Sequence, residues 1–266
     1  NCDEPISIPE PFIGNRTVLE TREEKLAYEN FFWFNALEKI TSSSSKMAAR
    51  RILILVFSWA RKHGLIVQNA MQNLRSPKVN EVDHKPFSKE EMEKIYALTK
   101  ATDFPSVYHP YLRMAYFCFL SGLRPNEAGS LCRASVGADG FIRIVGAKHR
   151  EPGKVSRLCK ITEPIAEVLR AECGGFPEGN GPVFVSKRGK PLNKDYRALA
   201  IKAACERLGI EPRDFYSTRR GTATEMFKSG YDVARIAGQL GHKKLATTMI
   251  YIKPTMRETA ETYRGF

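Results

Sequence analysis

The sequence predicts a mainly α-helical protein with one small antiparallel β-sheet, divided into two domains. Most apolar residues recur at the spacing of amphipathic or buried helices, and a single pair of short apolar segments surrounds a Pro-Gly turn. The stretch from Ser76 to Phe87 has two prolines and no periodicity. With 266 residues, 42% of them hydrophobic, the chain can form two separate cores. We therefore expect one domain over residues 1–83 and a larger one over residues 84–266.

The first domain is expected to be helical. Residues 1–20 indicate an extended arm, or the end of a module that precedes this part of the chain. A Thr-x-x-Glu capping box opens a helix over Thr21–Ile40. A second helix, over Lys46–Gly64, is apolar on nearly every face, and its final glycine is a typical helix terminator. Helices of this kind pack on other helices.

The second domain is expected to place several helices around the hairpin. A Ser-x-x-Glu box at Ser88 opens its first helix, and a strongly apolar helix follows over Tyr111–Leu123. The hairpin covers Phe141–Thr162, and Gly181–Ser186 is a short strand or extended segment. The remaining helices are expected over Glu163–Glu172, Lys194–Gly209, Gly221–Ser229, Asp232–Leu240 and Thr247–Arg257.

The charge of the chain indicates a polyanionic partner. The net charge is +13, and a strongly basic protein gains free energy by releasing the counterions that nucleic acids carry. The segment Ile40–Asn80 contains no acidic residue. Its basic residues, which we expect to contact nucleic acid, include Lys46, Arg50, Arg51, Arg61 and Lys62. A solvated basic helix is the plainer reading of the same segment.

Other classes of protein are not indicated. The six cysteines form no C-x-x-C pair and do not cluster with histidines, so we expect neither a zinc site nor a disulfide framework. No apolar run approaches the length of a membrane span. We expect no metal, no cofactor and no membrane association, and an intracellular protein, cytoplasmic and associated with the nucleoid if its source is prokaryotic or viral.

Three polar segments of the second domain have the residues that phosphoryl chemistry needs. A tyrosine has a pKa near 10, so it acts as a nucleophile at neutral pH only where cations stabilise the developing charge. Two guanidinium groups can hold the non-bridging oxygens of a phosphate through bidentate hydrogen bonds. The segments GLRPNEAGSL, FYSTRRGTAT and LGHKKLATTMIY contain Arg124 with Glu127, Arg219 with Arg220, and His242 with Tyr251.

These segments resemble those of the tyrosine recombinase (phage integrase) family. Members of the family carry G-L-R-x-x-E, a lysine in a hairpin, H-x-x-R, L-G-H, and a tyrosine nine residues after that histidine. The matching residues here are Arg124 with Glu127, Lys148, Tyr216 with Arg219, His242, and Tyr251. The first domain also resembles the helical core-binding domain of the family. Tyr216 departs from the pattern, because the family has a histidine there.

The resemblance implies a two-domain DNA clamp, with a helical core-binding domain and an α+β catalytic domain. It implies a site-specific recombinase that cuts and rejoins double-stranded DNA through a 3′-phosphotyrosyl intermediate, without metal or nucleotide. The catalytic residues would be Arg124, Lys148, Tyr216, Arg219, His242 and Tyr251, with Glu127 in support. Lys154 is the alternative to Lys148. Four protomers would assemble on two DNA sites and associate weakly or not at all without DNA.

Further DNA contacts are expected around these residues, at Arg150, Lys154, Arg220, Lys243 and Lys244. Two other functions remain open at this point. One is relaxation of DNA by an enzyme that resembles type IB topoisomerases. The other is a DNA-binding protein with a decayed site, for which Tyr216 is the one hint in the sequence.

Overall fold

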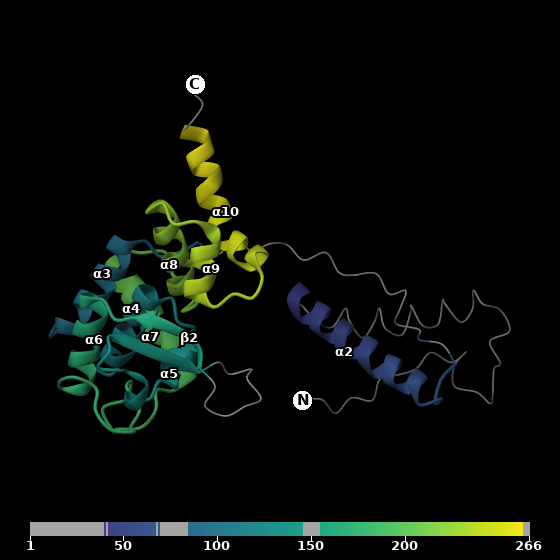
Figure 1. Ribbon diagram of the computed structural model, residues 1–266, viewed down its shortest axis with the longest axis horizontal. Helices are drawn as coiled ribbons and strands as arrows, with labels where there is room; N and C mark the ends of the chain where they lie inside the picture. Colours follow the sequence, from purple (N-terminus) through teal and green to yellow (C-terminus); the bar gives the residue numbers. More distant parts are fainter. Residues whose placement is uncertain (1–39, 41, 68, 70–84, 146–154, 263–266) are drawn as a thin grey trace. The chain divides into compact units, whose positions relative to one another are not determined.

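The computed structural model of the chain describes residues 40, 42–67, 69, 85–145 and 155–262 (Figure 1). The chain falls into two compact units, Asn1–Val82 and Asp83–Phe266. The arm and the helix expected over Thr21–Ile40 lie almost wholly outside the described residues, and so does the turn of the hairpin. In the part of the chain that is described, no helix is long and apolar enough to cross a membrane.

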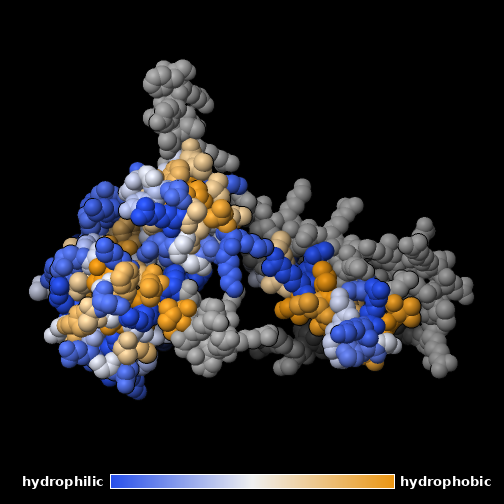
Figure 2. Space-filling view, in the orientation of Figure 1, coloured by the Kyte–Doolittle hydropathy of each residue, from blue (hydrophilic) through white to orange (hydrophobic). Residues whose placement is uncertain are grey.

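The described part of the first unit is dominated by helix α2, Ser43–Lys62. The Ser42 side chain accepts a hydrogen bond from the Ser45 amide and caps the helix. The first helical residue, Ser43, lies three residues before the expected start at Lys46. The helix ends next to Gly64, which has a φ of 71°. Ile52, Leu55 and other apolar side chains of α2 are exposed among its basic residues (Figure 2).

The second unit is mainly helical. Its α-helices are α3 (Lys89–Ala97), α4 (His109–Ser121), α5 (Pro125–Gly129), α6 (Glu163–Cys173), α7 (Lys194–Leu208), α8 (Ser217–Lys228), α9 (Val233–Leu240) and α10 (Leu245–Thr262). Short 3-10 helices lie at Leu98–Lys100 and Arg133–Ser135. The expected capping box at Ser88 is present, because the Ser88 hydroxyl and the Glu91 carboxylate each accept the other residue's amide.

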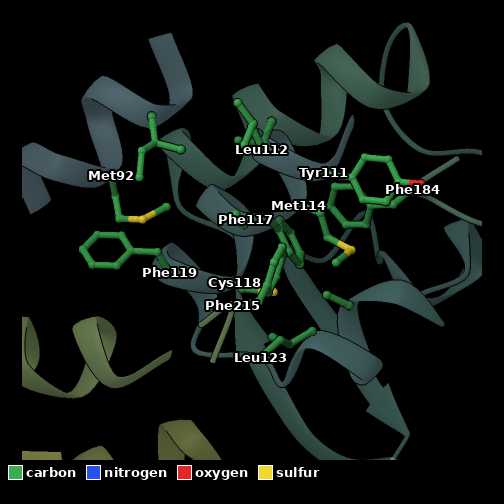
Figure 3. Close-up of a cluster of buried hydrophobic side chains, with 14 of the residues drawn as sticks. Met92, Tyr111, Leu112, Met114, Phe117, Cys118, Phe119, Leu123, Phe184 and Phe215 are labelled. Atoms are coloured by element: carbon green, nitrogen blue, oxygen red, sulfur yellow. The ribbon is translucent and has the colours of Figure 1, made fainter. Parts of the chain in front are cut away.

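Helix α4 forms the centre of the core. It packs against α3, α6, α7 and α8, and nearly all of its apolar side chains are buried. Figure 3 shows Leu112, Phe117 and Phe119 of α4 among side chains from other elements, including Met92 and Phe184. This packing holds the second unit together. A smaller apolar cluster, formed by Ala223, Ile236, Leu240 and Ile252, joins α8, α9 and α10.

The sheet consists of β1 (Phe141–Val145) and β2 (Val155–Lys160), paired antiparallel. Ile142 pairs with Cys159 and Ile144 pairs with Arg157. Because side chains alternate along a strand, Arg157 lies on the same face of β2 as the buried Cys159.

Helix α8 differs from its expected bounds. It begins at Ser217, four residues before the expected start at Gly221, because the Asp214 carboxylate accepts the Ser217 amide at 2.7 Å. Gly221 lies inside the helix, where a Cβ atom would be 2.4 Å from the Phe87 carbonyl oxygen. The glycine therefore permits close packing and does not open the helix.

Two other elements also differ. Helix α10 runs from Leu245 to Thr262, beyond the expected limits at both ends. The segment Gly181–Ser186 forms isolated bridges at Pro182 and Val185 and no regular strand. The expected short strand is therefore absent from this segment, which has bends between its two bridges.

Candidate active site

Arg219 lies in the first turn of α8 and is fully buried, with 0% of its surface exposed. Its guanidinium group donates to the carbonyl oxygens of Gly122 and Leu240, at the C-terminal ends of α4 and α9. These carbonyl groups carry partial negative charge that an arginine neutralises. Burial, and then the charge of Arg124, lower the pKa of Arg219 to about 10, so it stays charged at neutral pH.

Arg124 follows the left-handed Gly122 that ends α4, and it is the N-cap residue of α5. Its Nη1 donates to Glu127 Oε1 at 2.8 Å, its backbone amide donates to Glu127 Oε2 at 2.8 Å, and its Nη2 donates to the Gly241 carbonyl oxygen at 3.4 Å. Burial lowers the pKa of Arg124, but the Glu127 carboxylate outweighs burial and raises it overall. Half-buried Arg124 thus keeps its charge next to Arg219.

Glu127 is the acidic partner of this cluster, and 6% of its side chain is exposed. Burial alone would raise its pKa, but hydrogen bonds from Arg157, from the Arg124 backbone and from the Arg124 side chain lower it to about 2. The carboxylate is therefore ionised over the whole physiological range.

Arg157 belongs to the same cluster, although sequence reasoning did not single it out. Its two terminal nitrogens donate to the two oxygens of Glu127, at 3.3 and 2.8 Å, and its Nε donates to the Gln239 carbonyl oxygen at 3.1 Å. The available signal was an arginine at a core-facing position of a predicted strand, because a buried arginine needs an acidic partner.

His242 follows Gly241, which ends α9 in the left-handed conformation. Its Nδ1 lies 2.8 Å from the Thr248 hydroxyl oxygen, and its ring centroid lies 5.4 Å from that of Tyr251. Burial, and then the charges of Arg219, Arg124 and Arg157, lower the pKa of His242 to about 4. The imidazole is therefore neutral at pH 7 in the free protein.

Tyr251 lies in α10, half-buried between His242 and Arg220. The guanidinium carbon of Arg220 is 5.9 Å from the centre of the tyrosine ring. Burial and then the nearby Tyr216 raise the pKa of Tyr251, while Arg219 and Arg220 oppose the rise. The free protein therefore keeps the phenol protonated.

The structure brings seven of the predicted residues into this one region. They are Arg124, Glu127, Tyr216, Arg219, Arg220, His242 and Tyr251. Lys243 and Lys244 are exposed directly after His242. Lys148, Arg150 and Lys154 lie outside the described residues, so the choice between the two lysines stays a prediction.

The basic residues predicted in the first unit lie on α2, and they are Lys46, Arg50, Arg51, Arg61 and Lys62. In the described ranges, no group of three or more His, Cys, Asp or Glu side chains is arranged to hold a metal ion.

Arginines that converge next to a tyrosine are the set of groups that an enzyme needs to bind a phosphodiester beside a nucleophile. A protein-family model described as the phage integrase family matches residues 85–258, which is more than half of the chain. The chain belongs to the phage integrase family.

Curated relatives agree with this assignment. The tyrosine recombinase XerC of Herpetosiphon aurantiacus is 26% identical over 238 residues, which are 87% of this chain and 74% of the relative. The tyrosine recombinase XerC 2 of Ralstonia nicotianae is 27% identical over 257 residues, 94% of this chain and 71% of the relative. A XerC of Methylobacterium sp. is 34% identical over 136 residues, and that match covers 42% of the relative.

Solved structures share the fold. A Tn1549 transposon integrase in complex with a circular intermediate DNA has a TM-score of 0.67 at 13% identity, over 89% of this chain and 85% of the other. The XerH site-specific recombinase bound to its palindromic difH substrate has a TM-score of 0.65 at 18% identity, over 90% of this chain and 70% of the other. The mainly helical architecture with one small antiparallel sheet is thus confirmed as that of tyrosine recombinases.

Proposed function

We propose that Tyr251 is the nucleophile of a site-specific DNA recombinase, and that Arg124, Arg219 and His242 bind the phosphate under attack. The chain has the function of a tyrosine recombinase, as its curated relatives do. Those names do not favour the alternatives of a topoisomerase or of a DNA-binding protein with a decayed site. The observation that supports the residue roles most strongly is the convergence of Arg124, Arg219, His242 and Tyr251.

In the proposed cleavage step, the Tyr251 hydroxyl group gives up its proton to solvent, and its oxygen attacks a DNA phosphorus and forms a 3′-phosphotyrosyl bond, while the bond between this phosphorus and the 5′ oxygen breaks. The two guanidinium groups hold the negative charge that grows on the non-bridging oxygens. Lys148, or Lys154 in its place, protonates the departing 5′ oxygen. The 5′-hydroxyl group of a partner strand then attacks the phosphotyrosine and releases Tyr251. Phosphodiester bonds are conserved, so no nucleotide is required.

His242 and Tyr216 have supporting roles in this proposal. The imidazole contacts Thr248 through Nδ1, so its second nitrogen is the one available to a phosphate oxygen. Tyr216, at the N-cap position of α8, interacts with Arg124 and stands where the family has a histidine. Its hydroxyl group can donate a hydrogen bond to phosphate in place of the imidazole, and adduct formation by Tyr216→Phe tests this.

DNA is the partner, and the assembly on DNA is a further part of the proposal. As the family resemblance implies, the predicted core-binding domain, residues 1–83, and the predicted catalytic domain, residues 84–266, would clamp the duplex, with the basic residues of α2 on the phosphates. Four protomers would join two DNA sites, as the family resemblance implies. Light scattering of the protein with and without its DNA site measures the mass of the particle, and from it the number of protomers on each site. A particle that never exceeds one protomer per site would contradict the tetramer.

The test of the nucleophile uses a pool of randomised DNA duplexes that carry a nick near the position to be cut. Cleavage next to the nick releases a short fragment, so the covalent adduct accumulates and can be sequenced after a denaturing gel. The unsubstituted chain should form the adduct and Tyr251→Phe should not. Tyr196→Phe is the matched control, because Tyr196 is an exposed tyrosine on α7. Adduct formation by Tyr251→Phe would refute the assignment of the nucleophile.

A further inference from the structure

We propose that Arg157 is a positioning residue for the cleavage reaction, which fixes Glu127 and, through Glu127, the guanidinium group of Arg124. The inference rests on the proposed function, because it assigns Arg157 to the orientation of a group that binds the phosphate. It adds a residue of strand β2 to the described cluster.

The contacts of Glu127 show why one arginine is not enough to orient it. Each carboxylate oxygen accepts twice: Oε1 from the side chains of Arg124 and Arg157, and Oε2 from the Arg124 backbone and the Arg157 side chain. A carboxylate bound by Arg124 alone would be free to rotate with it. The planar fork of Arg157, on the other side, fixes the plane of the carboxylate.

Arg157 is itself held firmly. Its side chain is 9% exposed, and its Nε donates to the Gln239 carbonyl oxygen near the end of α9. The Gln239 side chain in turn donates to the Ser121 carbonyl oxygen at 3.0 Å. A Cβ atom on Gly241 would lie 2.7 Å from Arg157 Nη1, so the arginine fills the space beside the residue that precedes His242.

Arg157 therefore connects three segments that the site needs. It lies on strand β2 and contacts the first turn of α5, which Arg124 precedes as the N-cap residue. It also contacts the end of α9, and His242 follows that end. An ion pair that serves only the fold is the competing explanation. Stability alone is a weak reason to retain such a pair, because burying two charges costs about as much as their attraction returns.

The experiment compares Arg157→Lys and Arg157→Gln with a matched control, Arg113→Gln. Half-buried Arg113 of α4 pairs with the buried carboxylate of Glu172 on α6, so the control also takes an arginine away from a buried glutamate. The substrate is a nicked duplex of the sequence selected from the randomised pool. Both Arg157 variants should form the adduct about 10- to 100-fold more slowly, as substitutions behind a ligand-binding group usually do, and should bind the duplex as tightly as before.

A second substrate separates positioning from folding. In a methylphosphonate, a methyl group replaces one non-bridging oxygen, so the reaction depends less on positive charge. The defect of the Arg157 variants should shrink on this substrate, and Glu127→Gln combined with Arg157→Gln should be no slower than the slower single variant. A purely structural defect would be equal on both substrates.

The outcomes are distinct. If the unsubstituted chain forms no adduct, the proposed function itself fails. If the unsubstituted chain forms the adduct and both Arg157 variants form it at the same rate as the unsubstituted chain, only the proposed role of Arg157 fails. The role of Arg157 also fails if the adduct rates of its variants fall only as far as their lowered melting temperatures explain, with Arg113→Gln showing the same relation between rate and melting temperature.

Discussion

At the scale of single residues, the site combines strong positive charge with a neutral histidine. Arg124, Arg157 and Arg219 surround His242, and Glu127 is the carboxylate that offsets them. Adding a proton to the imidazole would place a further cation there. The imidazole is thus neutral because of its burial and then because of the nearby arginines, which we propose bind phosphate.

The histidine should make stability depend on pH. The folded pKa is about 4, below the ordinary value near 6.5, so the unfolded chain binds more protons between these limits. The contribution of His242 is complete above pH 6.5 and is lost as the pH falls towards 4. Urea unfolding of the free protein should therefore show the stability difference between the unsubstituted chain and His242→Asn decreasing by about 1–2 kcal/mol from pH 7 to pH 4. A constant difference would contradict the depressed pKa.

At the scale of elements, the site is formed where helices end. Left-handed Gly122 ends α4 and left-handed Gly241 ends α9, and the carbonyl oxygens of Gly122 and Leu240 meet at Arg219. A Cβ atom on Gly122 would lie 2.8 Å from the Leu240 side chain. The two helix ends can therefore approach closely because one of them is a glycine.

Gly241→Ala and Gly209→Ala form a matched pair that tests this element. Both residues end a helix with a φ near 65°, so each alanine should cost about 1 kcal/mol of stability. No atom lies within 4 Å of a Cβ on Gly209, whereas a Cβ on Gly241 meets Arg157. Only Gly241→Ala should also slow adduct formation, by roughly tenfold. Equal rates for the two variants, measured on the nicked duplex, would show that Arg157 can move aside freely.

At the scale of the whole molecule, the net charge of +13 makes DNA binding a salt-dependent process. We expect the logarithm of the association constant to fall linearly with the logarithm of salt concentration. Arg61→Gln and Lys62→Gln, at the exposed end of α2, should each reduce that slope by about one if they contact phosphates.

Lys202→Gln is the control for this measurement, because exposed Lys202 lies on α7 and pairs loosely with Glu206. Fluorescence anisotropy of a labelled duplex at several salt concentrations measures all three variants. Unchanged slopes for the α2 variants would mean that this basic helix is a solvated surface, the plainer reading of its sequence.

Local sequence was sufficient for many of the elements. Ser88 with Glu91, and Asp232, cap helices where their side chains reach amides three residues away, and such contacts depend little on the rest of the fold. The start of α8 was missed, because the carboxylate that accepts the Ser217 amide belongs to Asp214, in a turn without helical periodicity.

The sequence by itself determined the family, and it predicted a division of the chain and a set of residues that we propose carry the chemistry, because these depend on residue type and spacing. Only the tertiary structure decided which groups surround them. Glu127 and Arg157 are 30 residues apart, and Arg219 lies 97 residues from the Gly122 carbonyl that it binds. The depressed pKa of His242 and the shared carboxylate arise from burial and from charges brought together by folding, which no local pattern encodes.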